Sequence, residues 1–160
     1  MQRKLLSLIL ITALTYSCSK GLSSKDEPNK INNENRVEIK KTNEAGQVEI
    51  ARKTIFFETN SFVFDEVKND FIKKEILPLI NSDSKIAVIV EGHCDERGSS
   101  PYNKRLGKKR ADAIKKFLVK SGIKSSKILA ISYGENKPVD EGHNEDAWSK
   151  NRRVEIVLFK

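Results

Sequence analysis

The feature that most limits the possible folds is an unbroken apolar run at residues 86–90, which reads Ile-Ala-Val-Ile-Val. A run of this length without polar interruptions is typical of a β-strand covered on both faces. We therefore expect it at the centre of a sheet. Further strands are predicted at residues 53–58, 128–132 and 153–159.

Two helices are expected between these strands. Asp65 is a suitable N-cap for the first helix, which Pro78 should end or kink. The second helix is predicted at residues 103–121, with Gly122 closing its C-terminal end. Strands alternating with helices in so short a segment predict an α+β fold with two layers, in which helices pack on a sheet.

The composition changes near Gln47 and divides the chain. Residues 19–47 are rich in Ser, Lys, Asn, Asp and Glu, and they contain too few apolar side chains to offset the entropy of ordering them. We therefore interpret residues 18–47 as a flexible tether. Residues 48–160 have the length and pattern of a single domain.

The first 17 residues have the character of an export signal. Arg3 and Lys4 precede an apolar run at residues 5–14, and small or polar residues lead from there to Cys18. The run is about half of the roughly 20 residues that cross a bilayer, so we expect residues 1–17 to be a cleaved signal peptide.

Cys18 resembles the acceptor cysteine of a bacterial lipoprotein signal. Its thiol would be acylated before cleavage, and stable anchoring would require more than one acyl chain. Ser19 is compatible with sorting to the outer membrane, so we expect a lipid-anchored protein on the periplasmic face of that membrane. The alternative is simple secretion, which would leave Cys18 an ordinary thiol.

The net charge restricts the partners. Removal of residues 1–17 takes Arg3 and Lys4 from a formal charge of +8 and leaves +6. A basic surface can attract nucleic acid, anionic lipid or an anionic polymer. Export argues against nucleic acid and leaves the membrane surface and the cell-wall polymer.

One basic residue falls on the apolar side of the second predicted helix. At 100° per residue, five apolar side chains lie within about 140° of one another. They are Leu106, Ala113, Ile114, Phe117 and Leu118. Arg110 lies in the middle of this arc. A buried guanidinium costs several kcal/mol unless it is paired, so Arg110 requires a partner.

The segment at residues 91–98 offers such a partner. It follows the central strand, at the sheet edge where open sheets with helices usually bind ligands, and it contains Asp95. Asp95 and Arg110 could pair with each other. Alternatively, they could receive a zwitterion, with an α-ammonium group on Asp95 and an α-carboxylate held by Arg110 in a bidentate contact.

Several motifs in a fixed order resemble the OmpA-like peptidoglycan-binding domain, over residues 53–159. The similarity is closest to the peptidoglycan-associated lipoprotein branch of that family. The motifs are GHCDERG at residues 92–98, Tyr102-Asn103, LGKKRA at residues 106–111, SYGE at residues 132–135 with Pro138, Gly142-His143, and residues 148–155 with Asn151-Arg152-Arg153.

The resemblance implies a fold and a binding site. The fold is an α+β sandwich, with a mixed sheet of about four strands and two main helices on one face. The ligand is the diamino acid of the peptidoglycan stem peptide, held by Asp95 and Arg110. The resemblance also implies pocket positions for Asn60, Asn103 and Leu106, and supporting roles for His93, Glu96, Arg97 and Arg152.

The function implied is a non-enzymatic tether between the outer membrane and the cell wall, without a cofactor. A Tol-type periplasmic protein is a candidate second partner. Pro101 stands where the family often has Glu, and this change at the rim weakens the expectation of that partner.

Two other functions are less well supported. A hydrolase acting on the same polymer could use Asp95, Glu96 and His93, but adjacent residues in one tight loop rarely place their carboxylates across a scissile bond. A metal site built from His93, Cys94, Asp95 and His143 would require three consecutive residues to converge. We interpret His93 instead as a hydrogen-bonded structural residue and Cys94 as a small buried filler.

Overall fold

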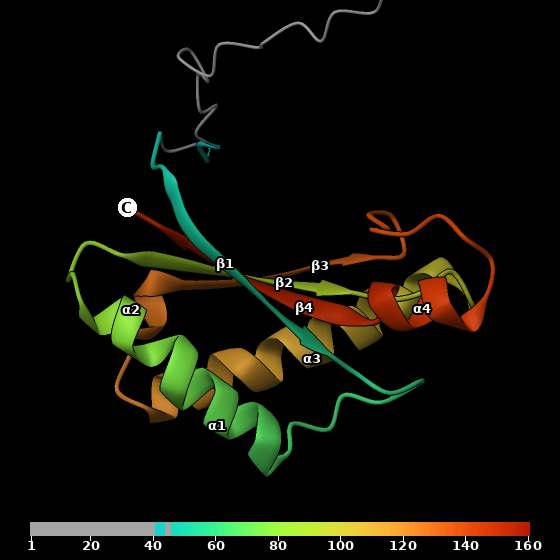
Figure 1. Ribbon diagram of the computed structural model, residues 1–160, viewed down its shortest axis with the longest axis horizontal. Helices are drawn as coiled ribbons and strands as arrows, with labels where there is room; N and C mark the ends of the chain where they lie inside the picture. Colours follow the sequence, from blue (N-terminus) through green and yellow to red (C-terminus); the bar gives the residue numbers. More distant parts are fainter. Residues whose placement is uncertain (1–40, 44–45) are drawn as a thin grey trace, which may run out of the picture. The chain divides into compact units, whose positions relative to one another are not determined.

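A mixed four-stranded sheet organises the computed structural model, in which residues 41–43 and 46–160 are described (Figure 1). The strand order is β1 (Glu49–Phe56), β4 (Arg153–Phe159), β2 (Ala87–His93) and β3 (Ile128–Gly134). β4 is antiparallel to both of its neighbours, whereas β2 and β3 are parallel. The predicted α+β fold with a mixed sheet is confirmed, and β1 and β2 therefore point in the same direction.

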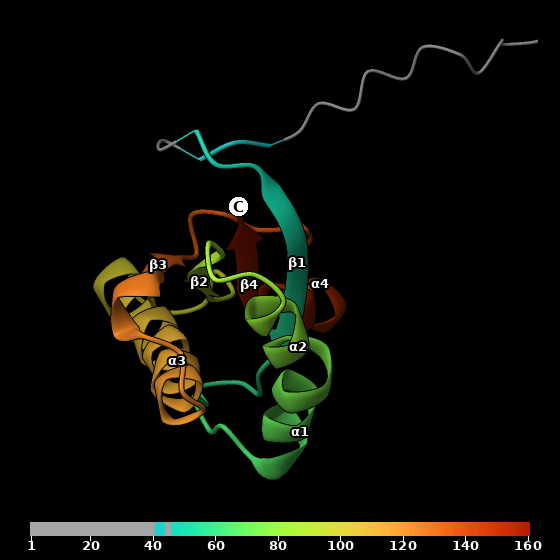
Figure 2. The same ribbon diagram turned by 90° about the vertical axis from the view of Figure 1, so that its left-hand side faces the viewer.

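The helices α1 (Glu66–Glu75), α2 (Leu77–Asn81) and α3 (Ser100–Lys120) cover one face of the sheet (Figures 1 and 2). Asp65 caps α1 as expected, because its side chain accepts a hydrogen bond from the Lys68 N–H at 3.0 Å. The main core lies between this helical layer and the sheet. Its fully buried members include Ile72, Ile76, Val88, Val90, Ile114, Leu118, Val154 and Ile156.

α3 begins three residues earlier than predicted, at Ser100, because Pro101 is tolerated in the first turn of a helix. It ends at Lys120 with Ser121 as its C-cap, and Gly122 follows with a φ of 96°, the left-handed conformation expected of a residue that closes a helix. The two short helices η1 (Ser125–Lys127) and α4 (Glu145–Asn151) are additional to the prediction.

α3 approaches β2 at a contact between two glycines. A Cβ atom added to Gly92 would lie 1.9 Å from the Gly107 carbonyl oxygen. A Cβ atom on Gly107 would lie 2.3 Å from Ser132 Oγ and 3.0 Å from the Gly92 carbonyl oxygen. Backbone therefore packs directly on backbone, and this contact sets the distance between α3 and the strand that precedes the Asp95 loop.

The second face of β2 differs from the prediction. Val88 and Val90 are buried against the helices, but Ile89 on the opposite face is only half-buried. Among the described helices, none covers that face in Figure 1. The strand register places charged residues of β1, β2 and β4 on it. Arg52 pairs with Glu91 at 3.2 Å and also with Glu155.

Several predictions concern residues outside the described ranges. These are the signal peptide at residues 1–17, the lipidation of Cys18 and most of the tether at residues 18–47. At the C-terminal end of that predicted tether, Thr42 and Val48 form an isolated antiparallel bridge. Within residues 41–43 and 46–160, no helix combines the length and apolarity needed to cross a bilayer.

Candidate ligand-binding site

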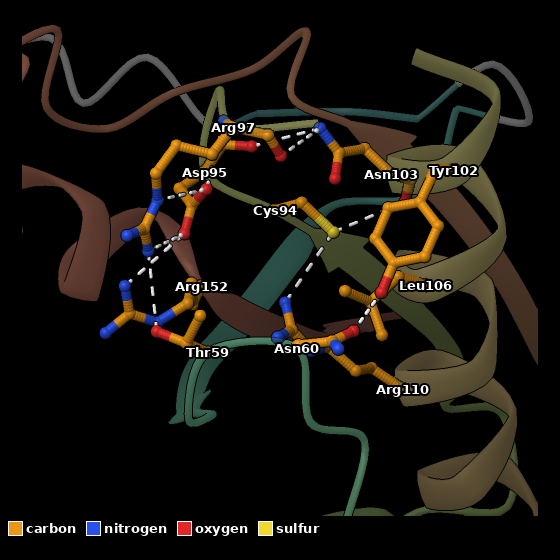
Figure 3. Close-up of a pocket in the computed structure, with 10 residues that line it drawn as sticks. All are labelled: Thr59, Asn60, Cys94, Asp95, Arg97, Tyr102, Asn103, Leu106, Arg110 and Arg152. Carbon is orange, nitrogen blue, oxygen red and sulfur yellow. Dashed lines mark hydrogen bonds and ion pairs between the residues drawn. The ribbon is translucent and has the colours of Figure 1, made fainter. Parts of the chain in front are cut away.

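A cavity of about 80 Å³ opens where the loops after β1 and β2 meet the first turns of α3. The five predicted pocket residues all line it: Asn60, Asp95, Asn103, Leu106 and Arg110. Five further residues complete the wall: Thr59, Cys94, Arg97, Tyr102 and Arg152. Figure 3 shows Asp95, Arg97 and Arg152 grouped on one side, with Tyr102, Leu106 and Arg110 of α3 on the other.

Arg110 is fully buried, and backbone carbonyls surround its guanidinium group. Nε donates to the Ser61 carbonyl at 2.7 Å, Nη1 to the His93 carbonyl at 2.9 Å, and Nη2 to the Glu58 carbonyl at 3.1 Å. No carboxylate of the described residues forms an ion pair with it. Burial lowers the pKa of Arg110 from its ordinary value, because the charged form is poorly solvated there.

These contacts leave part of the guanidinium available. A guanidinium has five N–H groups, and the three carbonyls use one each from Nε, Nη1 and Nη2. Nη1 has one further hydrogen-bond partner among the described residues, Cys94 Sγ at 3.6 Å, which is a weak acceptor. One N–H on Nη1 and one on Nη2 therefore remain for an anion.

Asp95 is also buried, with 6% of its surface exposed, but it is paired. Its Oδ1 accepts from the Arg97 backbone N–H at 3.0 Å and from Arg97 Nε at 3.2 Å. Its Oδ2 accepts from Arg97 Nη2 at 2.9 Å and from Arg152 Nη1 at 3.3 Å. Burial alone would raise the pKa of Asp95, but the hydrogen bonds from Arg97 and Arg152 outweigh it and hold the pKa below its ordinary value.

The two arginines at Asp95 differ in mobility. The Arg152 side chain is 6% exposed and is held by the Phe57 carbonyl at 3.2 Å and by Glu145 at 2.6 Å. The Arg97 side chain is 39% exposed, and its guanidinium carbon lies 4.2 Å from the centre of the Trp148 ring. Arg152 is therefore part of the framework, whereas Arg97 forms an outer wall of the cavity.

Asn103 and Cys94 fasten the Asp95 loop to α3. Asn103 Nδ2 donates to the carbonyls of Asp95 and Arg97, both at 3.2 Å, and Cys94 Sγ lies 3.3 Å from the Asn103 carbonyl. On the opposite rim, the Tyr102 hydroxyl donates to Asn60 Oδ1. Asn60 has a φ of 55°, a left-handed conformation that Asn tolerates better than most residues.

Two of the supporting side chains face other surroundings. Glu96 accepts from Trp148 Nε1 at 3.0 Å and contacts His143 Nδ1 at 2.8 Å, beside a second cavity. His93 contributes its carbonyl to Arg110, but the interpretation of its ring as hydrogen-bonded is wrong. Neither ring nitrogen has a hydrogen-bond partner in the described part of the chain, and the ring stacks on that of Tyr133 with 5.4 Å between the ring centres.

The four residues considered for a metal site are not the set that converges. Within the described part of the chain, the grouping with metal-like spacing is Glu91, His93 and Glu155, whose ligand atoms lie within 4.8 Å of one another. Both carboxylates of this group are already bound by arginine. Arg52 contacts Glu91 and Glu155, and Arg153 Nε donates to Glu155 at 2.6 Å.

The fold and the charged cavity define a small α+β domain, in which a mixed sheet carries the cavity at the carboxyl ends of β1 and β2. A sequence profile described as the OmpA family matches residues 56–152, and the chain belongs to this family.

Three relatives illustrate the similarity. The chain is 31% identical to the peptidoglycan-associated lipoprotein of Buchnera aphidicola, over 96% of this chain and 95% of the relative. It is 49% identical to the Haemophilus influenzae protein of the same name, over 49% of this chain and 51% of the relative, so this match spans about half of each. The crystal structure of the peptidoglycan-associated lipoprotein from Burkholderia pseudomallei has a TM-score of 0.62 and 31% identity, covering 66% of this chain and 88% of that one.

Proposed function

We propose that this chain is an outer-membrane lipoprotein whose domain binds the peptidoglycan stem peptide without modifying it, and so holds the outer membrane to the cell wall. The names of its relatives support peptidoglycan as the ligand. In this proposal residues 1–17 are the signal peptide, Cys18 carries the lipid, residues 18–47 are the tether and residues 48–160 bind the wall.

The single observation that carries the proposal is the environment of Arg110. Among the described residues, the fully buried Arg110 guanidinium has hydrogen-bond partners that are all neutral, namely three carbonyls and the Cys94 thiol; a buried charge without an opposite charge is costly. A ligand carboxylate that reaches the two remaining N–H groups would compensate it with charge-assisted hydrogen bonds. In this proposal, the three carbonyls fix the position of the Arg110 guanidinium, and its two remaining N–H groups bind an anion that the ligand supplies.

Asp95 supplies the opposite charge in the same cavity. The diamino acid of a stem peptide has an ammonium group and a carboxylate on one carbon, so a single end of the ligand can address both residues. The cavity of about 80 Å³ holds only a few water molecules, which suits the charged end of an amino acid and leaves the rest of the peptide outside.

The geometry does not favour catalysis. Asp95 lines the cavity with Arg110, whereas Glu96 is engaged by His143 and Trp148 beside a different cavity. A glycosidase requires two carboxylates that face one bond. We therefore propose a binding protein, not a hydrolase.

Co-sedimentation with purified peptidoglycan tests the proposal. Asp95→Asn and Arg110→Gln should each weaken binding by roughly 2 to 5 kcal/mol, because each removes one charge of the cavity and leaves the opposite charge of the ligand desolvated and without its contact. Glu96→Gln is the matched control for Asp95→Asn, and it should bind like the wild type. Wild-type binding by a folded Asp95→Asn protein would refute the pocket assignment, and release of soluble muropeptides by the wild type would favour the hydrolase.

The membrane anchor requires a separate experiment. Cys18→Ala should move the protein from the membrane fraction to the soluble fraction of cells and abolish labelling by a radioactive fatty acid. An unlabelled wild-type protein would refute the lipid anchor without affecting the pocket.

We also propose a Tol-type periplasmic protein as a second partner. Crosslinking in intact cells tests this contact, and Pro101→Glu is the variant expected to strengthen it.

A further inference from the structure

The Asp95 carboxylate is saturated in the free protein. It accepts four hydrogen bonds, three from Arg97 and one from Arg152. A carboxylate has about four acceptor positions, so an additional ammonium group has no position of its own. If the ligand's ammonium group is to bind Asp95, one of the present donors must leave.

The charges of the cavity lead to the same requirement. Three guanidinium groups, those of Arg97, Arg110 and Arg152, line the cavity with one carboxylate, Asp95. The carboxylate of a zwitterionic ligand would pair with Arg110, so its ammonium group would be added at Asp95, which two guanidinium groups already contact, and would place a third positive charge there in a poorly solvated space. Exchange of one guanidinium group for the ammonium group would leave the charge around Asp95 unchanged.

Arg97 is the arginine that can leave. Its side chain is 39% exposed, whereas that of Arg152 is 6% exposed. Arg97 Nη1 already lies 3.7 Å from Glu145 Oε2, on a side chain that is 60% exposed, while Oε1 of the same carboxylate accepts from Arg152. The guanidinium also lies over the Trp148 ring, a favourable surface for a cation outside the cavity.

We propose that the Arg97 side chain occupies the ammonium subsite of the free protein, and that a ligand bearing an ammonium group displaces it from Asp95 toward Glu145, along the Trp148 ring on which it already lies. This inference rests on the proposed function. Departure of Arg97 Nε and Nη2 frees one position on each oxygen of Asp95, while the Arg97 backbone N–H and Arg152 keep the carboxylate in place.

Arg97 thereby determines which ligands bind well. A ligand with both charges displaces Arg97 and pairs with Asp95 and Arg110 together. A dicarboxylate without an ammonium group has nothing to offer Asp95, so Arg97 stays and the ligand gains only the contact with Arg110. The opposite possibility is that Arg97 itself grips the ligand's carboxylate, and in that case its removal would weaken binding.

Calorimetric titration of the domain with two probes separates these possibilities. The probes are meso-diaminopimelate and pimelate, which have the same carbon chain and differ in the two ammonium groups. Arg97→Met keeps an unbranched apolar stem and removes the charge. It should bind diaminopimelate about 3- to 10-fold more tightly than the wild type does, with no gain for pimelate. Arg105→Met, the same change on the exposed side of α3, should alter neither affinity.

A spectroscopic measurement reports the displacement directly. In ¹⁵N spectra of the wild type, the Arg97 Nε–H signal should shift when diaminopimelate is added and should stay in place when pimelate is added. Weaker or unchanged diaminopimelate binding by Arg97→Met would overturn the inference. If the wild type binds diaminopimelate and Asp95→Asn does not, the proposed function survives that result. If the wild type binds neither probe nor peptidoglycan, both fail.

Discussion

Gly92→Ala should be one of the most damaging small substitutions in the domain. Gly92 is not among the described glycines with positive φ, so alanine itself causes no backbone strain there. The problem is space, because the new Cβ atom would lie 1.9 Å from the Gly107 carbonyl oxygen, whereas ordinary contact begins at 3.4 Å. α3 would have to move away from β2 by about 1.5 Å, since neither group is a side chain that can rotate.

The cost can be assembled from two contributions. Forcing a methyl group into a packed contact costs about 1 to 3 kcal/mol. A shift of this size would also carry the hydrogen bond between Arg110 Nη1 and the His93 carbonyl, now 2.9 Å, beyond bonding distance. Loss of a hydrogen bond to a charged group costs about 1.5 to 3 kcal/mol. We expect a total loss of roughly 3 to 5 kcal/mol in the free energy of unfolding, or a fall of 10 °C or more in Tm.

Urea and thermal unfolding measure this loss, and peptidoglycan co-sedimentation should show weaker binding by the part that stays folded. Gly122→Ala is the control, since a Cβ atom there meets nothing within 4 Å and only the φ of 96° is unfavourable. In Gly107→Ala, the first obstacle is Ser132 Oγ at 2.3 Å, so Ser132→Ala should restore part of the stability. The same second change should not rescue Gly92→Ala. A Gly92→Ala protein as stable as the wild type would refute the argument.

Three further substitutions test other contacts. Burial is the main reason why the pKa of His93 is lowered to about 4, so below pH 6.5 the unfolded chain takes up a proton that the folded protein does not. As pH falls from 7 to 4, the free energy of unfolding of the wild type should therefore decrease by up to about 3 kcal/mol through this residue. In His93→Leu, the free energy of unfolding measured in urea should depend less steeply on pH across that range. Equal pH dependence in the two proteins would contradict this. Asp65→Ala removes the cap of α1 and should cost about 1 kcal/mol in urea unfolding, whereas Asp70→Ala should cost less than half of that. Cys94→Ala removes only weak sulfur contacts and should change the affinity for peptidoglycan less than threefold; a tenfold loss would show that the thiol positions Arg110.

The sequence predicts the burial of Arg110 because the helical period alone places it between Leu106 and Ile114. Its partners are not predictable in the same way. They are three backbone carbonyls, two of them in the irregular loop after β1, and a carbonyl position depends on the path of the chain and not on the residue type. The same limit applies to the pairing of Asp95 with Arg152, which joins residues 57 apart in sequence.

The element boundaries show a comparable division. β4 occupies the predicted residues 153–159, since an apolar-rich run adjoins two arginines there. β1 begins at Glu49, four residues before the prediction, because the polar residues at its start suit an edge strand and resemble a loop in sequence. α4 was not predictable from periodicity. It spans only seven residues, and its one clear signal is Asn144, whose side chain accepts from the Ala147 N–H at 2.9 Å.

The parallel directions of β1 and β2 have a mechanical consequence. Both strands finish at the cavity, so the described chain enters β1 at Glu49, at the far end of the sheet. In a protein anchored through its N-terminal segment and gripped at the cavity, tension would run lengthwise along β1. The hydrogen bonds between β1 and β4 are perpendicular to the strands, so this tension would load them in shear. All of them would then bear the force at the same time, instead of opening one after another.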